Sequence, residues 1–292
     1  MKNSAAGDKD KTVLSVEGLV KKYGKKKALQ GVSFKIAGGD FLGLLGPNGA
    51  GKTTTIKILT GLTKLTEGGV YYYGKDFSSH PGEAKRFIGM VPQQSNLDRD
   101  LTAFQNLYLH TILHGIPKAL RMEKIDEALE FAGLMEYRNR QVKTFSGGMR
   151  RRLVIVRALL HEPRILFLDE PTVGLDPQIR RTLWELILKV NQVKGTAILL
   201  TTHYIEEAEK LCDRVLIINR GRIIAEGPPD DLKKDIGGYV LEIFLEDRIE
   251  EQFFSTREDA LERLKGCDHS CKVREVTLED VFLKLTGRRI NV

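Results

Sequence analysis

The sequence predicts an α/β fold in which a parallel β-sheet is flanked by helices. Short apolar strands alternate with amphipathic helices along most of the chain, a pattern typical of parallel sheets. One apolar stretch, residues 41–46, leads directly into a glycine-rich loop and then into a helix. The 292 residues, 41% of them hydrophobic and 29% charged, are enough for one large domain and a small appendage.

The N-terminal region predicts antiparallel strands before the parallel sheet begins. Residues 1–12 have no apolar stretch and are expected to form a flexible tail rather than a secretory signal. Strands are then predicted from "VLSVEGLVKKY" (13–23) and "VSFKI" (32–36). After the buried strand at 41–46 we expect a helix at 52–62 that stops at Gly61, and strands from "GGVYYYGKDF" (68–77) and "IGMVPQ" (88–93).

Residues 94 to about 160 change in character and predict a helical subdomain inserted into the α/β core. Apolar residues recur there at helical spacing, and no strand pattern is present. Alternation resumes with a strand at 164–170, a helix at 176–195, a strand at 196–203, a helix at 204–212 and a hairpin at 213–227. The main domain is therefore predicted to span 13–235. Residues 236–292 are predicted to form a C-terminal α+β extension with one strand and two helices.

The loop "GPNGAGKT" (46–53) matches a phosphate-binding pattern of P-loop NTPases. Glycines let backbone N–H groups converge on phosphate oxygens, and the dipole of the following helix favours an anion. Lys52 is expected to reach the β and γ phosphates, and the Thr53 hydroxyl to bind Mg²⁺. The predicted nucleotide contacts here are Gly46, Pro47, Asn48, Gly49, Ala50, Gly51, Lys52, Thr53 and Thr54.

A second acidic element follows the apolar strand "ILFLDE" (165–170). Its two carboxylates emerge at the C-terminal end of the strand, where ligands bind in such sheets. Asp169 is expected to hold Mg²⁺, and Glu170 to be the general base that activates the attacking water. Together with the phosphate loop, this pair predicts hydrolysis of a nucleoside triphosphate.

The chain resembles the nucleotide-binding subunit of an ATP-binding-cassette (ABC) transporter, with motifs in that family's order from residue 13 to about 230. "TFSGGMRRR" (144–152) resembles the family signature, usually Leu-Ser-Gly-Gly-Gln, and departs from it at Met149. Met offers only a weak sulfur acceptor, so a side-chain amide contact is lost there. The further residues that the resemblance implicates are Tyr23, Gln93, Ser146, Gly147, Gly148, Asp176 and His203.

The resemblance implies a role for each of these residues. Tyr23 stacks on adenine, Gln93 reaches Mg²⁺ and nucleotide (with Gln94 leaving a one-residue ambiguity), and His203 contacts the γ-phosphate. Asp176 lies in the D-loop counterpart "GLDP" (174–177), and Glu170, His203 and Lys52 are the catalytic set. In the family two cassettes pair head to tail, so residues 146–148 of one chain face the γ-phosphate bound by the glycine-rich loop of the other.

Two features of the resemblance favour export. "FSGGM" followed by arginines, and the tail "VTLEDVFLKLTG" (276–287), resemble the subgroup of the daunorubicin-resistance ATPase. No apolar run reaches the roughly 18 residues of a membrane-spanning helix, so separate transmembrane permease subunits are the expected partners. The chain is expected at the cytoplasmic face of the membrane as a peripheral subunit. A homodimer is the simpler pairing, because both half-sites look complete.

Other cassette proteins remain alternatives at this level. DNA-repair ATPases of this type contain a long coiled coil, and the sequence has no heptad run that would form one. Ribosome-associated factors have two cassettes in one chain, and only one is present here. A nucleic-acid partner is therefore not expected. A basic N-terminal stretch, with eight lysines and three acids in residues 1–27, is interpreted as a solvated edge. An iron–sulfur assembly ATPase is the alternative that composition does not exclude.

The three cysteines do not form a disulfide framework, and "CDHSC" (267–271) is interpreted as a surface turn.

Overall fold

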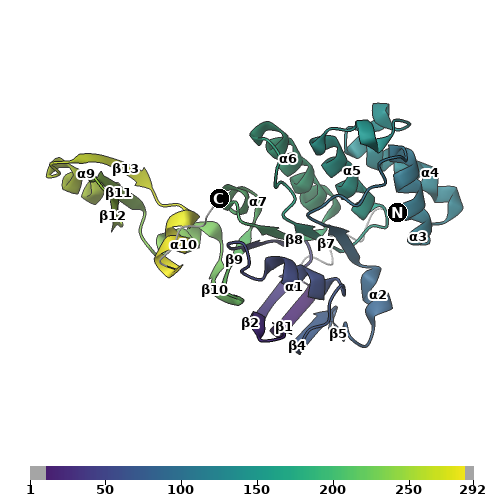
Figure 1. Ribbon diagram of the computed structural model, residues 1–292, viewed down its shortest axis with the longest axis horizontal. Helices are drawn as coiled ribbons and strands as arrows, with labels where there is room; N and C mark the ends of the chain where they lie inside the picture. The colour runs from purple at the N-terminus through teal and green to yellow at the C-terminus, as the bar shows by residue number, and fades with distance from the viewer. Residues whose placement is uncertain (1–10, 287–292) are drawn as a thin grey trace.

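The computed structural model describes residues 11–286 and contains a six-stranded central sheet (Figure 1). Five of its strands are parallel, and β10 at one edge is antiparallel to its neighbour. The strand order is β10 (Arg222–Gly227), β9 (Arg214–Asn219), β3 (Phe41–Leu45), β8 (Ala197–Thr202), β7 (Ile165–Asp169), β6 (Ile88–Val91). The predicted α/β class with a parallel sheet is confirmed.

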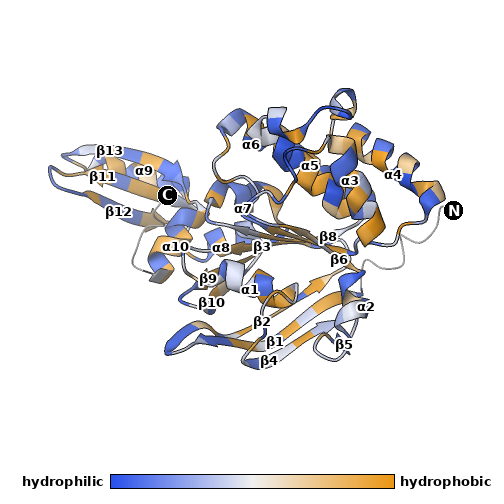
Figure 2. Ribbon diagram, turned by 45° about the vertical axis from the view of Figure 1, so that its right-hand side comes forward, coloured by the Kyte–Doolittle hydropathy of each residue, from blue (hydrophilic) through white to orange (hydrophobic). Residues whose placement is uncertain are grey.

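Alternation along the central strands creates two apolar layers, because successive side chains point to opposite faces. Phe41 and Leu45 of β3 belong to one buried cluster, and Leu42 and Leu44 belong to the other. The first layer is covered by α5 (Gly147–Leu159), α6 (Pro177–Lys194) and α7 (Ile205–Leu211). On the second lie α1 (Lys52–Leu59) and an antiparallel sheet (Figure 2). Helices flank both faces as predicted, but one face is shared with β-structure.

The antiparallel sheet confirms the predicted N-terminal strands. Its order is β2 (Lys26–Ala37), β1 (Thr12–Tyr23), β4 (Glu67–Tyr72), β5 (Lys75–Asp76). The single strand predicted at 68–77 is broken, because Tyr73 and Gly74 both have positive φ and turn the chain into β5. A short helix, α2 (Pro81–Lys85), was not predicted. Of the predicted tail 1–12, residues 1–10 lie outside the described residues, and β1 begins at Thr12.

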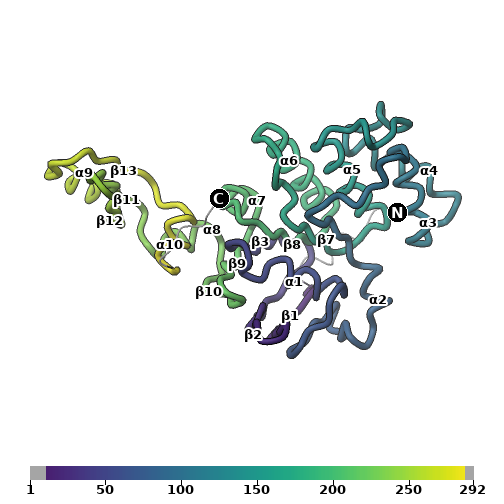
Figure 3. Tube along the Cα trace, viewed as in Figure 1, coloured from purple at the N-terminus to yellow at the C-terminus, as the bar shows by residue number. Residues whose placement is uncertain are grey.

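The helical subdomain contains α3 (Ala103–Leu113), α4 (Lys118–Phe131), two short 3₁₀ turns (Met135–Tyr137 and Val142–Thr144) and α5. Thr102 begins α3 with a capping box, in which the Thr102 side chain and Gln105 exchange hydrogen bonds with each other's backbone. Within residues 94–160 the structure has no strand and only one isolated bridge, Thr102 to Gln141, which agrees with the predicted helical character. The subdomain lies at the opposite end of the molecule from the C-terminal sheet (Figure 3).

The C-terminal region contains more β-structure than predicted. After α8 (Pro229–Lys234) the chain forms β11 (Tyr239–Phe244), β12 (Ile249–Phe254), α9 (Arg257–Lys265) and β13 (Ser270–Glu275), with β11 central in an antiparallel sheet. The sequence indicated only β11, because β12 and β13 are largely polar, half-exposed edge strands without a clear alternation. This sheet projects from the core (Figure 1).

The last helix, α10 (Leu278–Thr286), packs on the main domain and also contacts the projecting sheet, through Asp280 and Arg274 of β13. Phe282 is 2% exposed and belongs to the same buried cluster as α7 and α8. The backbone N–H of Leu278 donates to Glu209 of α7 at 3.0 Å. Among the described residues, no helix combines the length and the apolar character that crossing a membrane requires.

Candidate nucleotide-binding site

The glycine-rich loop between β3 and α1 has the backbone shape that phosphate binding requires. Gly51, the residue before α1, has φ 116°, a value that L side chains rarely adopt. At Gly46 an added Cβ would lie 2.2 Å from the carbonyl oxygen of Ile218, so no side chain fits. No side chain caps α1, which leaves the N–H groups of its first turn directed at the loop. The geometry is that of an anion cradle.

Lys52 is fixed inside this loop. Its Nζ donates to the carbonyl oxygens of Gly46 (2.8 Å) and Pro47 (3.2 Å), and it lies 3.1 Å from Oε1 of Glu170. Lys52 is 4% exposed and Glu170 is 7% exposed, so the ion pair is almost fully shielded from water. The Lys52 ammonium can therefore exchange the Glu170 carboxylate for an incoming phosphate as its anionic partner.

Glu170 contacts three other side chains predicted to belong to the site. It directly follows β7 and has φ 46°, an uncommon conformation for a residue other than glycine, Asn or Asp. Its backbone N–H donates to the Thr201 carbonyl oxygen at 3.1 Å. Its carboxylate accepts from Gln93 Nε2 (3.1 Å, at Oε2), and its Oε1 lies 3.2 Å from His203 Nδ1. Side chains that follow two neighbouring strands, β6 and β8, and Lys52 of the loop therefore converge on the carboxylate that follows β7.

Asp169 lies beside Glu170 but has different partners. Its Oδ1 accepts from the Thr201 hydroxyl (2.7 Å) and from the Thr53 hydroxyl (3.2 Å). Thr53 is on the first turn of α1, so the two oxygens predicted to bind Mg²⁺ face each other across the loop. Oxygen donors of this kind, completed by phosphate and water, are what Mg²⁺ prefers. The residues present therefore fit the ion.

A pocket of about 300 Å³ opens over the loop. Tyr23, at the end of β1, is 49% exposed at its rim, and Lys21 Nζ lies 4.7 Å from the centroid of its ring. The pocket is lined by Tyr23, Lys26, Ala28, Asn48, Gly49, Gly51, Lys52, Thr53, Thr54, Gln93 and Glu170. Lys26 and Ala28 were not predicted, although their place at the start of β2, just across the turn from Tyr23, was the available signal. Gln93, not Gln94, is the glutamine that lines the pocket and contacts Glu170.

The remaining predicted residues gather elsewhere on the same chain. Ser146 caps α5 by accepting from the N–H of Met149 (3.2 Å), and Asp176 caps α6 by accepting from the N–H of Ile179 (3.0 Å). At Gly148 an added Cβ would lie 2.5 Å from Ile179 Cγ2, so this glycine is required by packing against α6. The signature and the D-loop counterpart are therefore one surface unit, and neither lines the pocket.

Arg151 is a positioning residue that the sequence did not identify. It is 6% exposed, although it lies in a run of three arginines expected on the first turns of a helix. Its guanidinium donates to the carbonyl oxygens of Pro171 (2.6 Å), Gln93 (3.3 Å) and Asp169 (3.3 Å), and also to that of Pro92. Burial lowers its pKa to about 10, which still leaves it cationic at neutral pH. Arg151 thus joins α5 to the segments that carry Gln93 and the two carboxylates.

Comparison with known proteins agrees with this geometry. Residues 29–173 match the ABC transporter family. The chain is 40% identical over 305 aligned residues to Nod factor export ATP-binding protein I of Ralstonia nicotianae, covering 95% of each protein. The chain belongs to the ABC transporter family. It is the ATP-binding subunit of such a transporter, and its enzymatic activity is ATP hydrolysis.

Other ABC proteins support the assignment. The similarly named protein of Burkholderia lata is 42% identical over 291 residues, covering 92% of this chain and 95% of that one. A solved ATP-binding subunit of an ABC transporter has a TM-score of 0.71 at 28% identity, covering 94% of this chain and 100% of that one. A dimeric ABC cassette in a post-hydrolysis state with ADP and Pi has a TM-score of 0.66 at 30% identity, covering 74% and 98%.

Proposed function

We propose that the chain hydrolyses Mg²⁺-bound ATP between two cassettes and powers export through separate membrane subunits. The observation that carries the proposal is the convergence of Lys52, Gln93 and His203 on Glu170 at the mouth of the loop pocket. Export follows from relatives that are named for it and aligned over almost the whole chain. Those relatives are named for Nod factor, but the membrane subunits of a transporter select the substrate. We therefore propose the direction of transport for this chain, and not the transported molecule.

The chemistry follows from which partners Glu170 keeps. When the γ-phosphate takes over the Lys52 ammonium, Glu170 loses its neutralising partner and becomes available as a base. Water attacks the γ-phosphorus, its proton passes to the Glu170 carboxylate, and the bond to the β-phosphate oxygen breaks to release ADP. His203 Nδ1 and Gln93 Nε2 orient the carboxylate. Thr53 and Asp169 would hold Mg²⁺, which would supply positive charge to neutralise the phosphates.

Tyr23 provides the adenine contact in this proposal, because it stands exposed at the rim of the same pocket as the loop. Residues 146–148 and Asp176 lie outside that pocket, which supports their use on the ATP of a second copy. The Ser146 hydroxyl and the N–H groups of the first turn of α5 would then face the γ-phosphate across the interface. A homodimer at the cytoplasmic face of the membrane, bound to permease subunits, is the proposed assembly. The iron–sulfur assembly alternative has no support from the export-named relatives.

The test is the oligomeric state of Glu170→Gln with and without Mg-ATP, measured by light scattering. We expect ATP to convert the monomer into a dimer, since hydrolysis no longer reopens it. Ser146→Arg in the same background should abolish the dimer, and Ser79→Arg, on an exposed loop before α2, should not. If Glu170→Gln binds ATP and stays monomeric, the homodimer is wrong. Co-purification would then look for a related paired subunit.

A further inference from the structure

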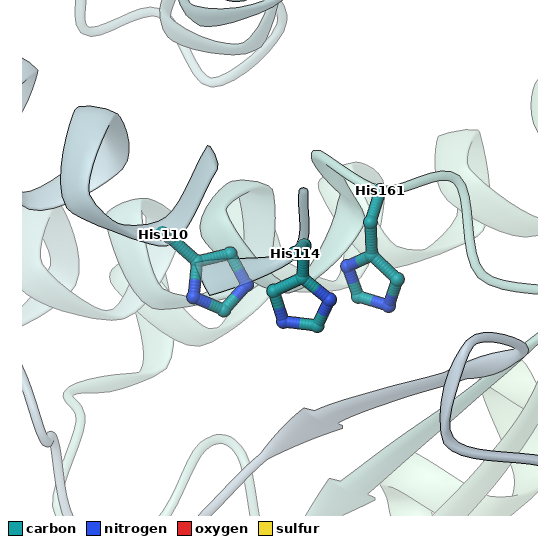
Figure 4. A group of neighbouring side chains, drawn as sticks. All are labelled: His110, His114 and His161. Atoms are coloured by element: carbon teal, nitrogen blue, oxygen red, sulfur yellow. The ribbon is translucent and has the colours of Figure 1, made fainter. Parts of the chain in front are cut away.

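Three of the six histidines gather outside the pocket that the nucleotide motifs line. His110 lies in α3 and His114 ends it one turn later, on the same face of the helix. His161 follows α5, before β7. One nitrogen from each ring lies within 4.8 Å of the other two. Figure 4 shows the rings side by side with His114 in the middle, and the ring centroids are 4.3 Å apart for His110 and His114 and 3.9 Å apart for His114 and His161.

The hydrogen bonds of His161 define its tautomer. Its Nε2 lies 2.9 Å from the carbonyl oxygen of Ile88, and because a carbonyl only accepts, Nε2 carries the proton. Nδ1 is then left with a lone pair, and it is buried with no partner. A ring N–H that donates to a backbone carbonyl behind the ligand atom is the arrangement seen in metal-binding histidines, where it fixes the ring and raises its basicity.

His110 also has a ring nitrogen that lacks a hydrogen-bond partner. Its Nε2 is also buried without a partner, although buried polar atoms are normally hydrogen-bonded. His114 is exposed, and its ring lies next to the rings of His110 and His161.

We propose that His110, His114 and His161 form a binding site for one divalent transition-metal cation, with Zn²⁺ as the probe of choice. Neutral imidazole suits Zn²⁺, and three protein nitrogens with water in the fourth position is a recurrent tetrahedral set. Zn–N bonds of about 2.0–2.1 Å put ligand nitrogens roughly 3.4 Å apart, so the rings must close from their present spacing. The exposed His114 is the ring with room to rotate.

The charged group that acts on His110 is Arg157. The positive charge of its guanidinium repels a metal cation bound at His110. Arg157 donates to the backbone carbonyl and side chain of Asn96, so its guanidinium is already committed away from the histidines. Three direct coordination bonds outweigh this through-space repulsion. A bound cation would tie α3 to the connection between α5, which is capped by Ser146, and β7, which ends at Asp169. The site would thereby restrain the helical subdomain relative to the nucleotide pocket.

The experiment is a Zn²⁺ titration by calorimetry of the full chain without a histidine tag, with Mg²⁺ in excess to occupy oxygen-rich sites. All proteins carry Cys267→Ser and Cys271→Ser, because the two thiols interact with each other and would also bind Zn²⁺. We expect one Zn²⁺ per chain. His114→Ala should weaken the affinity at least roughly tenfold, and the replacement of another exposed histidine, His80→Ala, should leave it unchanged.

A second measurement guards against misfolding. Because His114 is exposed, His114→Ala should keep the metal-free unfolding midpoint of the parent, whereas Zn²⁺ should raise the midpoint only when all three histidines are present. Co²⁺ should give the visible absorption of a tetrahedral nitrogen site in the parent and in His80→Ala, but not in His110→Asn or His114→Ala. Absence of Zn²⁺ binding by the parent, or equal binding by His114→Ala, would overturn the proposal.

Discussion

Lys52 and Glu170 form a buried ion pair, with Nζ 3.1 Å from Oε1. The pair joins the glycine-rich loop to the end of β7, so the proposed phosphate-binding group and the proposed catalytic base are already in contact. Removal of one partner from such a pair leaves the other charge buried and uncompensated. The pair therefore couples occupation of the loop to the availability of the base.

Replacement of Glu170 by Gln should separate binding from hydrolysis. Gln keeps the shape and can still face Lys52 and His203, but it takes no proton from water. We expect the ATPase rate to fall roughly 10²- to 10⁴-fold while ATP binding is retained. Steady-state phosphate release and equilibrium binding of a fluorescent ATP analogue check this. Glu162→Gln, which alters an ion pair with Lys124 away from the pocket, is the control. An unchanged rate in Glu170→Gln would exclude Glu170 as the base.

Replacement of Arg151 by Met should loosen the segments that carry Gln93 and the carboxylates. Several buried carbonyl oxygens, including those of Pro171 and Asp169, lose their donor. At roughly 1–3 kcal/mol for each unsatisfied group, partly relieved by relaxation, we expect a loss of about 3 kcal/mol in unfolding free energy. Urea denaturation measures it. Arg152→Met, which removes one bond to the Ala132 carbonyl, should cost less than half as much. Equal losses would show that Arg151 has no special role.

Replacement of Gly148 by Ala should destabilise α5 through Ile179. The new Cβ would lie 2.5 Å from Ile179 Cγ2, and such overpacking costs roughly 1–3 kcal/mol. At the neighbouring Gly147, an added Cβ would meet Leu175 only at 3.5 Å, so Gly147→Ala should be close to neutral for stability. Thermal unfolding of both variants decides the comparison. Ile179→Ala should rescue Gly148→Ala in a double-mutant cycle. Failure of that rescue would place the strain elsewhere.

Stability in acid should depend on the contact between Arg274 and Asp280. Burial alone would raise the pKa of Asp280, but hydrogen bonds from Arg274 and Thr277 outweigh it and hold the pKa below the usual 3.8. A carboxyl with a lowered folded pKa contributes stability above pH 3.8 that is lost as the pH falls through the folded value. Arg274→Met should cost roughly 2–4 kcal/mol at pH 7, and progressively less toward pH 3.

Urea unfolding of the wild type and Arg274→Met across that pH range tests this, with α10 followed by hydrogen exchange. Arg263→Met, at an exposed arginine of α9, should show no pH-dependent difference from the wild type. A cost for Arg274→Met that is the same at pH 3 and pH 7 would contradict the assignment to Asp280.

Elements with strong local signals were predictable from the sequence. The helix 176–195 was one such case, because Asp176 caps its start and Gly195, with φ 63°, ends it. β12 and β13 were missed because these edge strands are largely polar and only partly buried, so they show no clear apolar alternation. Arg151 was missed because its neighbours in the sequence are arginines, and nothing local distinguishes the one that is buried.

The sequence by itself determined the fold class, the phosphate loop, the acidic pair and the order of the motifs, because these depend on residue type and short-range spacing. Tertiary structure alone decided that Glu170 is shared by Lys52, Gln93 and His203, that Gly148 is required by Ile179, and that α10 returns to the main domain. It also decided that His161 meets His110 and His114. Each of these relations joins segments distant in sequence, and packing of the central sheet against its two apolar layers is what brings them within contact distance.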